Sequence, residues 1–161
     1  MDKFYRDDDI NVYTSVGEFH NIHKVFRKFN KTHTIACEMK DLWRNKGLFW
    51  YILTDPLINV ELHGWKHDPL IHLDLHEVVY ELSMAINYWH DNASRMLGKQ
   101  INELPDIKRI TTFFPPWNKV STNIEVACKK LKLRLSYKDE DCHWMFHFWA
   151  TTPREVAEKL Q

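Results

Sequence analysis

Residues 4–10 read Phe-Tyr-Arg-Asp-Asp-Asp-Ile, and residues 61–67 read Glu-Leu-His-Gly-Trp-Lys-His. Each stretch begins with residues that favour a β-strand and ends with side chains that bind metal ions. Aspartate is a hard oxygen ligand and histidine a borderline nitrogen ligand, so one carboxylate and two imidazoles can hold a divalent ion and leave coordination positions open. Open positions allow such an ion to activate water. Together, the two segments predict a metal-dependent hydrolase.

The length and composition indicate one globular domain over residues 1–161. Hydrophobic residues make up 44% of the chain and aromatic residues 14%, which is enough for a dense core. Lys plus Arg and Asp plus Glu number 22 each, so no net charge favours binding to nucleic acid or to an anionic membrane.

The cysteines and the N-terminal residues predict a cytoplasmic protein. Cys37, Cys128 and Cys142 fit neither a disulfide framework nor a CxxC zinc site, so we expect three buried, reduced thiols. The first residues lack the apolar run of a signal peptide, and no stretch reaches the ~18 apolar residues of a transmembrane helix. A phage protein released by lysis would have the same features.

The hydrophobic periodicity predicts strands that alternate with helices. The strands are expected at residues 3–8, 32–37, 58–63, 110–114, 133–137 and 144–149, and the helices at 15–30, 41–53, 75–97, 122–131 and 152–160. This order implies a mainly parallel sheet with helices outside it. Because a complete eight-unit barrel needs ~250 residues, we predict a truncated or distorted (β/α) barrel of about six mainly parallel strands. Ligands in such folds gather at the carboxyl ends of the strands.

Three adjacent carboxylates at a strand end repel one another unless a cation or an arginine offsets their charge. Successive side chains of a strand point to opposite faces, so at most two of Asp7, Asp8 and Asp9 can face one site. A solvated acidic turn is the alternative interpretation of this run.

His63 and His67 lie four residues apart, as in the HExxH zinc enzymes. The Glu of that motif is absent and Gly64 weakens a helix, so we expect a strand end followed by a loop or one helical turn. The chain has ten histidines, and a pair of this spacing also arises by chance.

Other histidines have separate interpretations. His20 and His23 are predicted on the surface of the first helix. His72 and His76 are expected to be structural. His72 could alternatively hydrogen-bond to a metal ligand and orient it. His147 lies in an apolar run, where it is either a hydrogen-bonded core residue or a general acid at a strand end.

Residues 113–118 read Phe-Phe-Pro-Pro-Trp-Asn. The two prolines make a rigid exit from the predicted strand. Trp117 offers a flat apolar face on which a sugar ring can stack, although tryptophan is also an ordinary core residue.

The order of these segments resembles the polysaccharide deacetylase family, carbohydrate esterase family four, which includes the chitooligosaccharide deacetylases. Its motifs are an Asp-Asp pair after the first strand, His-Ser/Gly-x-x-His, Arg-x-Pro-aromatic, an Asp/Trp segment and Leu-x-His. Residues 6–10 are similar to the first motif, with the pair aligned to Asp8 and Asp9 and an alternative alignment on Asp7 and Asp8. Residues 63–67, 114–117 and 145–147 are similar to the second, third and last motifs.

The resemblance implies a role for each matching residue. Asp9, His63 and His67 would bind a divalent metal, most often Zn²⁺. Asp8 would be the general base, and His147 the general acid that protonates the leaving amine. The implied reaction is the removal of N-acetyl groups from an acetylated sugar or polysaccharide.

Trp117, Pro116 and Trp65 are expected to contact the substrate. The sequence departs from the family because Phe114 stands where the family has its arginine, which orients the base. Arg6, on a neighbouring strand, could substitute for it. A clear Asp-x-x-Asp-Trp motif is also missing, and residues 139–144 replace it poorly.

Two alternatives to the deacetylase remain open at this stage. One is a non-catalytic carbohydrate- or metal-binding domain of the same fold. The other is a metal-dependent hydrolase of another amide or ester bond, because three ligands and a base serve either chemistry.

Overall fold

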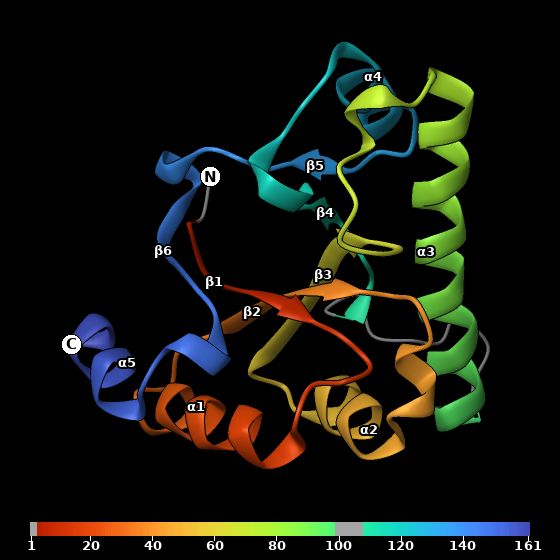
Figure 1. The fold of residues 1–161 in the computed structure, drawn as a ribbon. Helices are drawn as coiled ribbons and strands as arrows, with labels where there is room; N and C mark the ends of the chain where they lie inside the picture. Colours follow the sequence, from red (N-terminus) through yellow and green to blue (C-terminus); the bar gives the residue numbers. More distant parts are fainter. Residues whose placement is uncertain (1–2, 99–107) are drawn as a thin grey trace.

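A computed structural model of the chain describes residues 3–98 and 108–161. Strands and helices follow one another in this order: β1 (Phe4–Ile10), α1 (Val16–Lys28), β2 (His33–Glu38), α2 (Lys46–Thr54), β3 (Ile58–Gly64), α3 (Leu75–Leu97), β4 (Thr112–Phe113), α4 (Thr122–Lys130), β5 (Arg134–Leu135), β6 (Cys142–Phe146) and α5 (Pro153–Leu160). The sheet order is β5-β4-β3-β2-β1-β6, and every neighbouring pair is parallel. Helices surround the outside of the curled sheet (Figure 1). The predicted truncated barrel is therefore confirmed as a half-barrel.

Local signals placed most of the helices correctly. Helix α3 has the predicted bounds and ends on Gly98, whose φ of 62° is the left-handed conformation expected of a stop residue. Ser15 accepts a hydrogen bond from the Glu18 N–H at the start of α1, as its capping position predicts. The predicted helix over 41–53 instead consists of a short 3₁₀ turn and α2, because the Asn45 side chain caps a new helix start at the Leu48 N–H.

The strands of the second half differ from the prediction. β4 and β5 are shorter than expected. Pro115 and Pro116 have no N–H with which to continue the ladder after β4. β6 ends at Phe146 rather than at residue 149. A 3₁₀ turn, η7 (Phe148–Ala150), follows, with a hydrogen bond of 3.0 Å from the Ala150 N–H to the His147 carbonyl.

The core lies between the sheet and the helices. Its largest fully buried apolar side chains come from several elements: Phe19, Phe26, Phe49, Trp89 and Phe113. His23, predicted on the surface, is fully buried, and this prediction was wrong. It lies four residues after Phe19 and three before Phe26, so it shares the buried face of α1 with them. His20 is exposed, as predicted.

The three cysteines, Cys37, Cys128 and Cys142, are buried and free, as expected. No helix in residues 3–98 and 108–161 combines the length and apolar character that crossing a membrane requires.

Strand β3 ends in a turn that only glycine can make without strain. Gly64 has a φ of 113°, and a Cβ atom added to it would lie 2.9 Å from the Lys66 carbonyl oxygen. After this turn, the ring of His67 lies 5.1 Å from the ring of His63.

We expect Gly64→Ala to lower the free energy of unfolding by about 3 kcal/mol, because it adds a steric clash to an unfavourable backbone conformation. Urea denaturation measures this loss. Gly98→Ala is the matched control, since its φ is also positive but no atom lies within 4 Å of the added Cβ; it should cost about 1 kcal/mol. Equal losses for the two variants would contradict the proposed clash.

Candidate active site

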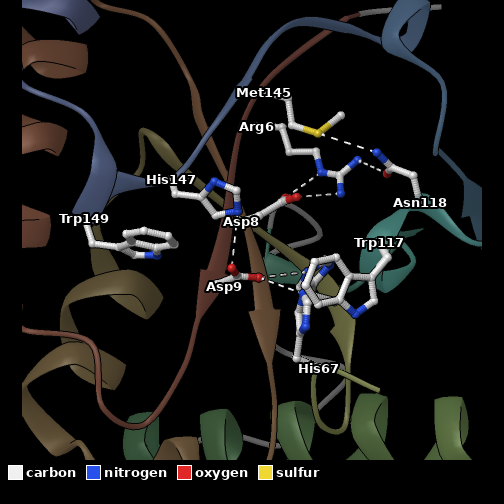
Figure 2. A pocket seen from close by; sticks show the side chains of 10 residues that line it. Arg6, Asp8, Asp9, His67, Trp117, Asn118, Met145, His147 and Trp149 are labelled. Atoms are coloured by element: carbon white, nitrogen blue, oxygen red, sulfur yellow. Dashed lines mark hydrogen bonds and ion pairs between the residues drawn. The ribbon is translucent and has the colours of Figure 1, made fainter. Parts of the chain in front are cut away.

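A cavity of about 430 Å³ opens at the carboxyl ends of β1 and β3. Its walls are completed by the segments that follow β4 and β6. The residues that line it are Arg6, Asp8, Asp9, His63, His67, Trp117, Asn118, Met145, His147 and Trp149. Figure 2 shows these side chains converging from elements that are far apart in the sequence.

A bulge in β1 divides the three aspartates between two environments. The register of β1 against β2 shifts between Asp7 and Ile10, and Asp9 has a left-handed φ of 63°. Asp8 and Asp9, although adjacent, therefore both reach the cavity. Asp7 is fully buried in the core, where burial raises the pKa of its carboxyl well above the ordinary value, against the opposing effect of a hydrogen bond from the Phe148 N–H. This geometry favours the pair Asp8 and Asp9 over Asp7 and Asp8.

Asp9, His63 and His67 form a cluster whose ligand atoms all lie within 4.8 Å of one another. Asp9 Oδ1 is 3.2 Å from His63 Nε2 and 3.1 Å from His67 Nε2. His63 Nδ1 lies 2.7 Å from the Phe114 carbonyl oxygen, which accepts its proton and leaves Nε2 free to act as a ligand. One carboxylate oxygen and two imidazole nitrogens fit a borderline divalent ion such as zinc.

His147 approaches the cluster from the other side. Its Nε2 lies 3.2 Å from Asp9 Oδ2. The hydrogen bond to Asp9 raises the pKa of His147 above its usual value, since it outweighs the opposite effect of burial. For Asp9, burial acts to raise the pKa, but the hydrogen bonds with His147 and His63 prevail and hold it well below the ordinary value. Each partner of this contact thus favours the charged form of the other.

Arg6 holds Asp8 in a fixed orientation. Its Nε and Nη2 donate to the two carboxylate oxygens of Asp8 at 2.5 and 2.7 Å, and both side chains are buried. Its Nη1 donates to Asn118 Oδ1 at 3.2 Å. The Phe114 ring lies 4.4 Å from the centre of the guanidinium. Phe114, which stands where the family has its arginine, therefore packs against Arg6, the arginine that pairs with Asp8.

Two indoles flank the cluster (Figure 2). Trp117, 67% exposed, meets the ring of His67 edge-on at 4.8 Å, and Trp149, 61% exposed, lies 5.0 Å from the ring of His147. Both indoles line the cavity, but only Trp117 was predicted to do so. Trp117 has a left-handed φ of 59°, and such strained backbone is concentrated at functional sites.

Pro116 and Trp65, the other expected substrate contacts, are not among the residues that line the cavity. Pro116 is buried, and its Cγ faces Gly64. Trp65 packs edge-on against the Tyr88 ring at 5.2 Å. Their positions support the turn after β3 and the wall that carries Trp117.

Several other candidates also lie outside the cavity. His72 belongs to a 3₁₀ turn before α3, and His76 lies in the first turn of α3. Residues 139–141 form a 3₁₀ turn before β6, and Trp144 stacks on Phe146 at 4.3 Å. The family's Asp/Trp segment therefore has no counterpart among the described residues that line this cavity.

A second cavity of about 390 Å³ adjoins the first and shares Asp9, His67 and Trp149 with it. Its walls include Tyr13, which is 91% exposed, and Glu38 at the end of β2. Burial raises the pKa of Glu38 above its ordinary value. The cluster of Asp9, His63 and His67 therefore lies where two cavities meet.

Three lining residues of the first cavity, Asn118, Met145 and Trp149, were not predicted from the sequence, and neither were those that line the second cavity alone, such as Tyr13 and Glu38. The first three are neighbours of recognised motifs, and Glu38 ends the second strand, where the carboxyl-end rule points to ligand contacts. The position of these residues at or near the ends of strands was therefore the signal that could have identified them.

Comparison with solved structures relates this fold to family 4 carbohydrate esterases. A family 4 carbohydrate esterase from Streptomyces lividans, solved in complex with acetate, superposes with a TM-score of 0.69 at 14% identity, over 99% of this chain and 85% of the other. Peptidoglycan deacetylase PdaC from Bacillus subtilis superposes with a TM-score of 0.64 at 14% identity, over 98% and 82%. A family 4 pseudoenzyme from Bacillus anthracis gives 0.63 at 12% identity, over 98% and 50%.

The chain thus has the polysaccharide deacetylase fold that its motifs predicted. It spans about half the length of the pseudoenzyme. Identities of 12–14% establish the fold and leave the reaction open. No protein-family model matches the sequence, and no curated protein sequence matches it.

We expect Asp9→Ala, His63→Ala and His67→Ala each to lose bound zinc, because two ligands hold the ion much less tightly than three. Elemental analysis of the purified, zinc-loaded and desalted variants measures the metal content. Asp8→Asn is the matched control, since it alters the adjacent carboxylate of the same bulge and should retain zinc. Retention of zinc by all three alanine variants would contradict the assignment of the ligands.

Proposed function

We propose that this protein is a metal-dependent hydrolase that removes N-acetyl groups from an acetylated amino sugar or polysaccharide. The observation that supports it most strongly is the convergence at one cavity of the three-residue cluster, the carboxylate of Asp8 held by Arg6, and the imidazole of His147. A set of ligands, a base and an acid at one cavity are the parts that hydrolysis of an acyl group requires.

Each residue has a defined role in this proposal. Asp9, His63 and His67 would hold a divalent ion, which we propose to be zinc. When bound, such an ion lowers the pKa of water and polarises an acyl carbonyl. Asp8 would accept a proton from the attacking water, because its carboxylate is held in one orientation at the cavity. His147 would donate a proton to the leaving amine, since its contact with Asp9 favours the charged imidazole.

The exposed aromatic rings in the walls of the two cavities favour a substrate made of sugar rings. Trp117 and Trp149 present exposed apolar faces on opposite sides of the cluster, and the apolar face of a sugar can stack on each. Tyr13 adds a third exposed ring, on a turn held by hydrogen bonds from Asn45 to the carbonyls of residues 12 and 14. We infer that the substrate extends over more than one sugar unit.

A non-catalytic carbohydrate- or metal-binding domain is the second candidate, because the same fold occurs in a pseudoenzyme. Hydrolysis of another amide or ester bond is the third, because the proposed ligands and base would serve an ester equally well.

The deciding experiment measures acetate released by the zinc-loaded protein from N-acetylated chitin oligomers and, separately, from O-acetylated xylan. We expect release from the chitin oligomers and none after removal of zinc with a chelator. Release from xylan alone would favour the ester hydrolase. Binding of oligomers without release from either substrate would favour the non-catalytic domain.

We expect Asp8→Asn and His147→Ala each to lower turnover by about 100-fold or more, because each removes one side of the proton transfer. Zinc content should stay unchanged in both variants. The control is His72→Ala, which alters a histidine outside the cavity and should keep full turnover. Normal turnover in Asp8→Asn or His147→Ala would show that the base or the acid is another group.

We expect Arg6→Lys to lower turnover by about tenfold with zinc retained, because an ammonium group cannot donate the two parallel hydrogen bonds that orient Asp8. The acetate assay and elemental analysis together measure this. Arg154→Lys, at an exposed ion pair on α5, is the control for the loss of a guanidinium. An unaltered rate in Arg6→Lys would mean that the orientation of Asp8 does not depend on Arg6.

A further inference from the structure

Four ionisable side chains lie buried behind the proposed active site, and the proposed reaction uses none of them. They are Asp7 in β1, His33 in β2, His23 in α1 and Asp55 after α2. Asp7 and both histidines are fully buried, and Asp55 is 7% exposed.

These side chains form one continuous line of polar contacts. Asp7 Oδ2 lies 3.0 Å from His33 Nε2, and His33 Nδ1 lies 3.2 Å from His23 Nδ1. His23 Nε2 lies 3.3 Å from Asp55 Oδ2. At the other end of the line, Asp7 Oδ1 accepts a hydrogen bond of 2.8 Å from the backbone N–H of Phe148. Phe148 directly follows His147, so the line ends at the backbone beside the proposed general acid.

Packing alone does not explain these residues. The His33 ring stacks on Phe26 at 4.2 Å, in a position that an apolar ring would also fill. Buried ionisable groups cost desolvation free energy, and apolar side chains of similar volume in their place are often neutral or stabilising. The hydrogen bond that Asp7 accepts from the Phe148 N–H accounts better for the presence of a carboxyl group at this position.

Donors and acceptors can be paired from the Phe148 N–H as far as the contact between His33 and His23. Burial lowers the pKa of His33 to about 3 and that of His23 to about 4, so both rings are neutral and each has one donor and one acceptor. If the Asp7 carboxyl donates to His33 Nε2, His33 Nδ1 can donate to His23 Nδ1, while His23 Nε2 lies 3.3 Å from Asp55 Oδ2 without a hydrogen bond of good geometry. Asp7 Oδ1 is then left as an acceptor for the Phe148 N–H.

The Phe148 N–H needs this acceptor because regular pairing ends just before it. The pairing of β1 with β6 ends where Asp7 faces Phe146. The 3₁₀ turn that begins at Phe148 has no side-chain cap from His147. The carboxyl oxygen of Asp7 thus supplies a hydrogen bond that ties the backbone to β1 beyond the last residue of the ladder.

We propose that Asp7 is a positioning residue, which fixes the backbone at His147 and Phe148 so that the His147 imidazole stays beside Asp9. In this arrangement His33, His23 and Asp55 hold Asp7 in place from the core. The expected effect of Asp7 on turnover rests on the proposed function, whereas its expected effect on the position of His147 does not.

The test compares Asp7→Leu with Asp7→Asn in the zinc-loaded full chain. Asparagine keeps an oxygen for the Phe148 N–H and a donor for His33, and leucine keeps only the volume. We expect Asp7→Leu to lower kcat for acetate release by about tenfold or more, with KM and zinc content unchanged, and Asp7→Asn to stay within about twofold of the original chain. A loss as large in Asp7→Asn as in Asp7→Leu would overturn the proposal.

Glu61→Leu is the matched control. Glu61 is also a buried strand carboxylate, and it accepts backbone N–H groups from Thr111 and Thr112, away from His147. Its loss should lower stability in urea but leave kcat unchanged. A decrease in kcat equal to that of Asp7→Leu would mean that both variants act through stability, and the proposal would fail.

Crystal structures of the same variants give a readout that does not need activity. The 3.2 Å contact between His147 Nε2 and Asp9 Oδ2 should be lost in Asp7→Leu and kept in Asp7→Asn. If the original chain releases no acetate, the proposed function fails while this comparison still decides the role of Asp7. If Asp7→Leu does not fold, His33→Phe removes the anchor of Asp7 and keeps the ring stacking; an unmoved His147 there overturns the proposal.

Discussion

The bulge in β1 at Asp8 and Asp9 is the constraint on which the rest of the site depends. Regular alternation would send these neighbours to opposite faces, but the register shift and the left-handed Asp9 turn both towards the cavity. β1 lies between β2 and β6; its pairing with β2 resumes at Ile10 after the irregularity, whereas its pairing with β6 ends at Asp7. Three consecutive carboxylates can then differ in function: Asp7 faces the core, Asp8 pairs with Arg6, and Asp9 joins two histidines.

The chain keeps a guanidinium beside the proposed base although Phe114 stands where related motifs have arginine. Arg6 reaches Asp8 from two residues away on the same strand, and the Phe114 ring packs against its charged group. The Phe114 carbonyl also accepts the Nδ1 proton of His63. One residue thus supports both the base and a proposed ligand, the first through its ring and the second through its backbone.

Local chemistry accounts for the parts of the fold that were predicted well. Alternating periodicity and caps such as Ser15 and Gly98 depend on neighbours in the sequence, so the helices and the parallel sheet could be predicted. The end of β6 at Phe146 could not, because it depends on contacts with distant segments. Trp149 was missed as a lining residue for the same reason, since it lies in a turn that replaces the predicted strand end. The burial of His23 had a local signal, its helical spacing from Phe19 and Phe26, which the prediction overlooked.

The sequence by itself determined the order of strands and helices, and its resemblance to a known family pointed to Asp9, His63 and His67 as candidate metal ligands. Periodicity and side-chain chemistry are local properties, so both could be deduced without coordinates. Only the tertiary structure decided which aspartates face the cavity and where Arg6 points. It also tied Asp7 to the chain beside His147, across 141 residues of sequence. These outcomes follow from the twist, register and bulge of a sheet whose neighbouring strands are distant in the chain, and no local pattern records that geometry.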